Sequence, residues 1–128
     1  MTALICLTYD DALAMHRETV APSLADRGLR GTFYVPAARA DLHERVAGWR
    51  AVTAGHELVN HSCWHPCRGR PSWLPRAYAL EDYDCRRIRD ELLIANSVLH
   101  LIDGESTLRP AAANVNLGRS GADHDYSR

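Results

Sequence analysis

The sequence predicts an α/β fold built on a parallel sheet, because strand-like and helical segments alternate along it. Short segments rich in apolar, β-branched and aromatic residues alternate along the chain with longer segments of helical periodicity. This alternation favours parallel strands that are joined by crossover helices. The length of 128 residues suits one domain. We therefore expect a single domain over residues 1–128.

Three segments are expected to form strands. "ALICLTY" (3–9) is a nearly continuous apolar run, which is typical of a strand buried on both faces. "LRGTFYVPA" (29–37) is rich in β-branched and aromatic residues, and "HELVNH" (56–61) indicates a third, shorter strand. The carboxyl ends of parallel strands meet at one edge of the sheet, which is where active sites of such folds lie.

Three longer segments are expected to form helices. The spacing of apolar residues indicates helices over 10–28 and 39–55, the first with a break or kink at Pro22. The clearest helix covers 81–103 and ends at Gly104. One side of it is apolar, and charged residues fill the opposite side. The apolar stripe consists of Tyr83, Ile88, Leu92, Ala95, Leu99 and Ile102.

Two segments lack such periodicity. Residues 62–80 contain three prolines and one glycine, which indicates a loop, and a loop of this length is often functional. Residues 105–128 show no sustained period, so we expect an irregular tail there.

Composition excludes several classes of function. The formal net charge is -1, so no nucleic-acid partner is expected. No apolar run approaches the roughly 20 residues of a membrane span, so no membrane partner is expected either. The N-terminal sequence lacks the features of a secretory signal, which indicates a cytoplasmic chain with reduced thiols. Cys6 and Cys85 are interpreted as small core residues. The absence of Lys excludes a Lys nucleophile.

Polar residues follow two of the predicted strands. Asp10 and Asp11 come directly after the first strand, His61 directly after the third, and His65 four residues later. The parallel topology brings all four to the same edge of the sheet. Two imidazoles and one carboxylate are a common ligand set for a divalent metal. Successive side chains on an extended backbone point oppositely, so the other carboxylate is available as a general base.

Other interpretations of the same residues stay open at this point. Paired Asp residues after a strand commonly cap a helix. Two His residues four apart are often incidental. The segment "HSCWHPC" (61–67) also offers His61, Cys63, His65 and Cys67 as a structural Cys/His zinc site, although their alternating spacing suits a tetrahedral ion poorly.

Three segments together resemble one known family. "TYDD" (8–11), "GTFYV" (31–35) and "HSCWH" (61–65) are similar, in order and separation, to motifs of the polysaccharide deacetylases, carbohydrate esterase family 4. The resemblance covers about residues 3–104. It implies a distorted (β/α) barrel, here a partial one, and a divalent metal, usually zinc and sometimes cobalt. It also implies hydrolysis of N- or O-linked acetyl groups on an oligo- or polysaccharide.

The resemblance assigns roles to individual residues. By position, Asp10 resembles the catalytic base, and Asp11, His61 and His65 resemble the metal ligands. Ser62 resembles the residue that buttresses this loop by hydrogen bonding.

The third motif of the family is degraded in this sequence. The region reads "LRPAAANVNLG" (108–118), where the aromatic residue and the glycine of the motif are absent. Arg109 resembles the arginine that holds the base carboxylate. No general acid is assigned in this chain. The alternative is therefore a catalytically impaired remnant that binds metal or sugar without turnover, and a third is a small interaction domain without metal. A short sheet with unpaired edges also predicts a homo-oligomer.

Overall fold

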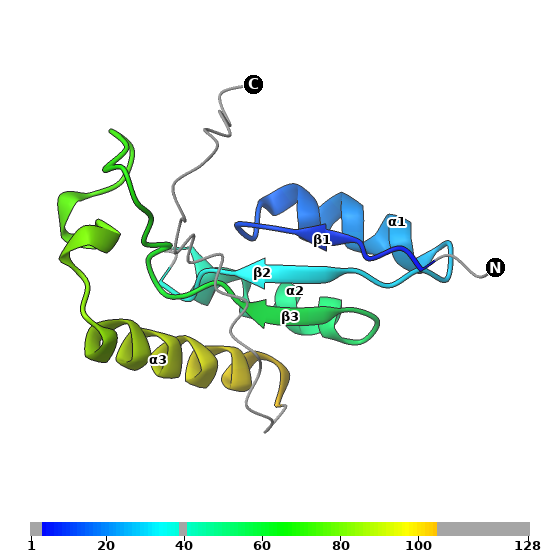
Figure 1. The fold of residues 1–128 in the computed structure, drawn as a ribbon. Coiled ribbons are helices and arrows are strands. Elements are labelled where there is room, and N and C mark those ends of the chain that lie inside the picture. The colour runs from blue at the N-terminus through cyan, green and yellow to red at the C-terminus, as the bar shows by residue number, and fades with distance from the viewer. Residues whose placement is uncertain (1–3, 39–40, 105–128) are drawn as a thin grey trace.

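The computed structural model describes residues 4–38 and 41–104. These residues form a mixed α/β structure around a sheet of three parallel strands in the order β1-β2-β3 (Figure 1). The strands are β1 (Thr8–Tyr9), β2 (Thr32–Val35) and β3 (Glu57–Asn60). The fold class predicted from the alternation of strands and helices is therefore confirmed. The predicted tail over 105–128 lies outside the described residues.

Helices connect and flank the strands. A π-helical segment, η1 (His16–Val20), leads into α1 (Ala21–Ala25), and α2 (Leu42–Thr53) connects β2 to β3. The loop after β3 contains two 3₁₀ turns, η2 (Arg76–Tyr78) and η3 (Leu80–Asp82). The long helix α3 (Cys85–Asp103) follows. Within the described ranges, none of these helices is long and apolar enough to cross a membrane.

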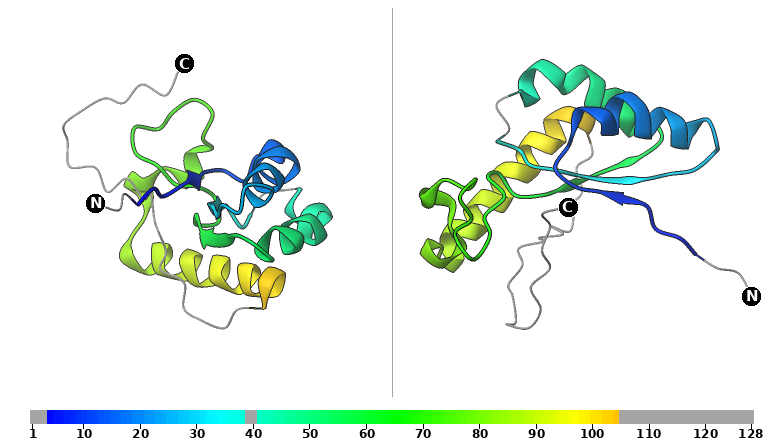
Figure 2. Two further views of the ribbon diagram at one scale, coloured as in Figure 1. Left: turned by 90° about the vertical axis from the view of Figure 1, so that its right-hand side faces the viewer. Right: turned by 90° about the horizontal axis from the view of Figure 1, so that it is seen from above.

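The helices cover one face of the sheet. Figure 2 shows α1 and α2 on the same side of the strands, while α3 packs against β3 and α2. On β2, Phe33 and Val35 are fully buried beneath these helices, whereas Thr32 and Tyr34 on the other face are only half-buried. This alternation is expected of a strand with one covered face. The core consists mainly of Leu24, Phe33, Val35, Trp49, Val52, Leu58, Leu99 and Ile102.

The first strand is the least accurate prediction. Only Thr8–Tyr9 form a strand, although 3–9 was predicted, and Leu4 and Ile5 are 93% and 82% exposed. An apolar run is buried only where neighbours cover it, and β1 is an edge strand in the described sheet. The prediction that Cys6 and Cys85 belong to the core is also wrong, because both are exposed.

Helix α3 agrees with its prediction at the C-terminal end, but it begins at Cys85 and not at residue 81, so Tyr83 lies outside it. Its first turn is capped by the Asp84 side chain, which accepts a hydrogen bond from the Arg87 N–H at 2.7 Å. It ends at Gly104, whose left-handed φ of 74° allows its N–H to bond the His100 carbonyl at 2.8 Å. Pro22 lies at the start of α1, where the π-helical η1 changes to α-helix, close to the predicted break or kink.

Candidate metal centre

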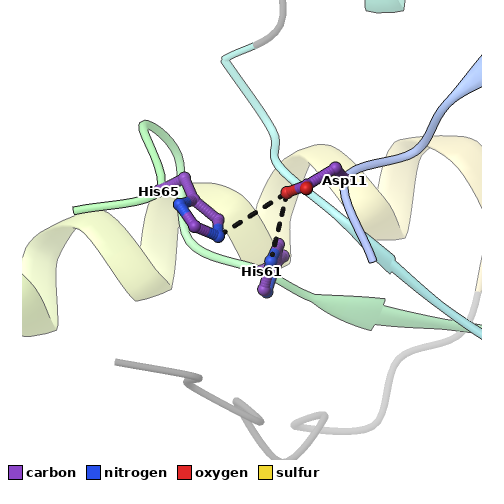
Figure 3. Close-up of side chains that lie close together, drawn as sticks. All are labelled: Asp11, His61 and His65. Carbon is purple, nitrogen blue, oxygen red and sulfur yellow. Dashed lines mark ion pairs between the residues drawn. The ribbon is translucent and has the colours of Figure 1, made fainter. Parts of the chain in front are cut away.

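Three side chains converge at the carboxyl edge of the sheet (Figure 3). Asp11 follows β1, His61 follows β3, and His65 lies in the loop after β3. Asp11 Oδ1 is 3.5 Å from His61 Nε2 and 3.5 Å from His65 Nε2. One potential ligand atom from each of the three residues lies within 4.8 Å of the others. The structure therefore brings together three of the residues that were expected to meet because they follow strands of a parallel sheet.

These three residues fit a divalent cation. His61 is 3% exposed, and its buried Nε2 has no hydrogen-bond partner among the described residues. The two imidazole rings lie 4.5 Å apart between centroids, and both Nε2 atoms face the same carboxylate oxygen. A buried nitrogen without a partner is unfavourable, and a cation would supply one. Two nitrogen donors and one carboxylate match the preference of zinc.

The backbone around the site adopts an unusual conformation. Asp11, Ala12, Ser62 and His65 have φ values of 71°, 50°, 62° and 53°. They are four of the five non-glycine residues with positive φ in the described part of the chain. Side chains disfavour this region, and such residues persist only where surrounding contacts hold them. The strain is thus concentrated in the two loops that carry the ligand side chains.

Asn60 and Ser62 hold the start of the loop after β3. The fully buried Asn60 amide donates to the Leu92 carbonyl at 2.9 Å and to Asn96 Oδ1 at 2.8 Å. Its own Oδ1 accepts a hydrogen bond from the Ser62 N–H at 2.7 Å. Ser62 Oγ in turn accepts from the His65 N–H at 3.0 Å, which is the buttressing contact expected of Ser62.

Glu91 on α3 holds the middle of the same loop. It is 2% exposed, and its Oε1 accepts hydrogen bonds from the Cys63 and Trp64 N–H groups, both at 3.1 Å. The helical periodicity predicted that charged residues lie opposite the apolar stripe, which is wrong for Glu91. One signal was available: Glu91 lies one helical turn before Ala95 and is therefore in line with the buried stripe.

The structure does not form the alternative Cys/His zinc site. Cys63 Sγ donates to the Glu91 carbonyl at 3.3 Å, away from the histidine pair. Burial, with a further contribution from the Glu91 carboxylate, raises the pKa of the Cys63 thiol to about 11. A protonated thiol is a poor metal ligand. Among the described residues, the group that could hold a metal contains no cysteine.

The π-helical segment that follows the paired Asp residues has no side-chain cap. The residue before η1 is Met15. Asp10 is exposed beside Asp11, and its role as general base stays a prediction. The two carboxylates act electrostatically on the buried His16, whose pKa is lowered by burial and partly restored by them. Arg109 lies outside the described residues.

Aromatic side chains surround the site. Trp73 is 64% exposed, and its ring lies 6.1 Å from that of His65. Tyr34 on β2 lies 5.7 Å from His61 between ring centroids. Trp64 is stacked on Tyr78 at 5.1 Å. Sequence reasoning had not singled out these residues, because an aromatic residue in a loop carries no periodic signal.

Comparison with known proteins gives one family and one similar structure. The family model of the polysaccharide deacetylases matches residues 2–116. The fold is similar to the crystal structure of a wild-type CE4 family pseudoenzyme from Bacillus anthracis, with a TM-score of 0.61 and 19% sequence identity. That alignment covers 80% of this chain but only 32% of the other. No curated protein matched the sequence.

Proposed function

The chain belongs to the polysaccharide deacetylase family, and from this premise we propose that it is a metal-dependent hydrolase that removes N- or O-linked acetyl groups from a carbohydrate. The convergence of Asp11, His61 and His65 at the carboxyl edge of the sheet carries this proposal. The acetylated oligo- or polysaccharide is part of the proposal and follows from the family.

Asp11, His61 and His65 would hold one divalent ion, zinc in the first instance, with cobalt or another ion as a substitute. Such an ion, when bound, polarises a carbonyl and lowers the pKa of water toward about 7. Both histidines would offer Nε2, the atom that faces Asp11 in each case.

The remaining roles concern proton transfer and substrate contact. Asp10 would act as general base and accept the proton of the attacking water, because it is exposed next to a ligand residue. Arg109 would orient the Asp10 carboxylate, in the role that the family gives to its arginine. The exposed ring of Trp73 beside His65 offers an apolar face against which a sugar ring could pack.

A second candidate is a remnant that binds metal or sugar without turnover. Two observations favour it. The third motif is degraded to "LRPAAANVNLG". The motif that holds the catalytic base in the family is therefore incomplete in this chain. The similar structure from Bacillus anthracis is described as a pseudoenzyme, although at 19% identity the likeness concerns the fold.

One experiment separates these candidates. The purified chain is analysed for bound metal and then assayed for acetate release from acetylated chito- and xylo-oligomers, with and without a chelator. Metal-dependent acetate release that is lost in Asp10→Asn supports the hydrolase. Bound metal without acetate release supports the remnant. A chain that neither retains nor takes up a divalent ion contradicts the hydrolase and the metal-binding form of the remnant. Binding of the intact oligomers by such a chain would support a remnant that binds sugar alone.

A further inference from the structure

We propose that Glu91 is a positioning residue of the metal centre, which acts by fixing the loop between the two histidine ligands. This loop, residues 61–65, is called the histidine loop below. The inference rests on the proposed metal site, but it concerns a residue of α3 that is distant in sequence from every proposed ligand. Its basis is a buried carboxylate that accepts hydrogen bonds from the backbone of the loop.

The contacts of Glu91 are directed at the centre of the histidine loop. Its Oε1 accepts from the N–H groups of Cys63 and Trp64, which are the second and third residues after His61. Its backbone carbonyl accepts from the Cys63 thiol. Three contacts from one residue thus hold the segment that separates the two ligands.

Burial makes these contacts obligatory for both partners. Glu91 is 2% exposed, so its carboxylate has little access to water and depends on protein donors. The Cys63 N–H is equally buried and would lack an acceptor without Glu91. Burial and the neighbouring Glu91 raise the pKa of the Tyr83 hydroxyl, so this group stays protonated beside the carboxylate.

The backbone of the histidine loop determines where the ligand side chains point. Ser62 and His65 are held at positive φ values of 62° and 53°, a conformation that an unrestrained loop would leave. His61 is already fixed by burial, whereas the His65 side chain is 32% exposed and depends on its backbone for orientation. Release of the loop from Glu91 should therefore displace His65 from Asp11 first. Residues that hold metal ligands in place by hydrogen bonds commonly contribute to metal affinity in this way.

The test compares Glu91→Ala, Glu91→Gln and Asp90→Ala with the wild-type chain. Asp90 is the matched control, because it precedes Glu91 on α3 and its contacts are ion pairs with Arg86 and Arg89 at the surface. Zn²⁺ affinity is measured by competition, and the geometry of the site is followed by visible absorption of the Co²⁺-loaded chain. Thermal melting of the metal-free chain records stability separately.

Glu91→Ala should bind Zn²⁺ about 10- to 100-fold more weakly and show an altered Co²⁺ spectrum. Glu91→Gln keeps an acceptor oxygen and should restore both toward wild type, while Asp90→Ala should match wild type. A folded Glu91→Ala chain with unchanged affinity and spectrum overturns the proposal. So does a Glu91→Gln chain as impaired as Glu91→Ala, because a carboxylate charge rather than loop positioning would then be responsible.

Amide hydrogen exchange tests the same inference without metal or activity. The Cys63 and Trp64 amides should be protected from exchange in the metal-free wild-type chain. They should lose much of this protection in Glu91→Ala and less of it in Glu91→Gln. If Glu91→Ala does not fold, unprotected Cys63 and Trp64 amides in the folded wild type still overturn the proposal. A wild-type chain that binds no metal contradicts the proposed function, whereas the exchange result then decides whether Glu91 holds the loop.

Discussion

The two histidines at the carboxyl edge of the sheet differ in their surroundings, and this difference decides which one to substitute. His61 is buried against Tyr34, so its truncation would leave a cavity and disturb the fold. The His65 side chain is 32% exposed and can be shortened with less disturbance. His65→Ala therefore isolates the loss of a ligand from the loss of the fold.

We predict that His65→Ala sharply lowers the zinc content of the purified chain, as measured by elemental analysis, because one of three ligands is lost. The control is the double variant Cys63→Ser/Cys67→Ser, which should retain its metal, since the introduced serine hydroxyl can replace the Cys63 thiol as donor to the Glu91 carbonyl. The opposite result, metal lost with the cysteines and kept in His65→Ala, would identify the Cys/His zinc site instead.

The neighbouring carboxylate gives a second prediction. Asp10→Asn should keep the fold and the metal, because Asp11 and not Asp10 belongs to the candidate ligand group. Loss of a general base typically costs about 100- to 10,000-fold in rate, so acetate release should fall within that range. Steady-state assays at saturating metal measure it. A decrease smaller than about tenfold would exclude Asp10 from this role.

At the level of elements, strand and helix order could be predicted because hydrophobic periodicity is local. The histidine pair and Asp11 could be placed together because strand ends share one edge of a parallel sheet. Glu91 and Asn60 could not be predicted in the same way. A buried polar side chain is stable only with specific partners, and the partners of these two lie 28 and 36 residues away.

The segment between β1 and β2 agrees with its prediction in part. One helix with a break or kink at Pro22 was predicted over 10–28, and the chain forms the π-helical η1 followed by the short α1, which meet just before Pro22. The π-helical segment begins at His16, which is buried with its ring 5.5 Å from Tyr9 and 6.1 Å from Phe33. A π-helical turn is frequent near functional sites, and this one lies between the Asp11 loop and α1.

Burial of His16 predicts a pH dependence of stability. Burial lowers its folded-state pKa below the unfolded value of 6.5, against the raising effect of Asp11 and Asp10. Below that pH the unfolded chain takes up a proton that the folded chain does not, so stability falls as pH decreases. Urea unfolding of the metal-free chain between about pH 7 and about pH 5 should show this loss.

A comparison of two histidine variants tests whether His16 causes this loss of stability at low pH. His16→Phe should be less sensitive to pH over this range, because a phenyl ring fits among aromatic neighbours and does not titrate. His43→Gln is the control, since the His43 side chain is 78% exposed. If both variants keep the full pH dependence of the wild type, His16 is not its origin.

At the scale of the whole molecule, the described sheet has two edge strands, β1 and β3. α3 packs against β3, but in the described part of the chain no strand pairs with the outer side of β1. The chain aligns with 32% of the length of the similar structure from Bacillus anthracis. The sheet of the described residues therefore presents a strand edge next to apolar side chains, and such edges promote association.

We predict that the purified 128-residue chain self-associates through the β1 edge. Leu4 and Ile5, just before β1, are 93% and 82% exposed, so contact with a second copy would bury both. The variant Leu4→Lys/Ile5→Lys should weaken association about tenfold or more, because it removes apolar contact area and adds repulsion between like charges. Light scattering over a concentration series measures this.

Leu101→Lys is the control, because Leu101 is 72% exposed on α3, away from the β1 edge. A wild-type chain that stays monomeric at every concentration contradicts the prediction, and equal weakening by both variants would show that association is not specific to β1.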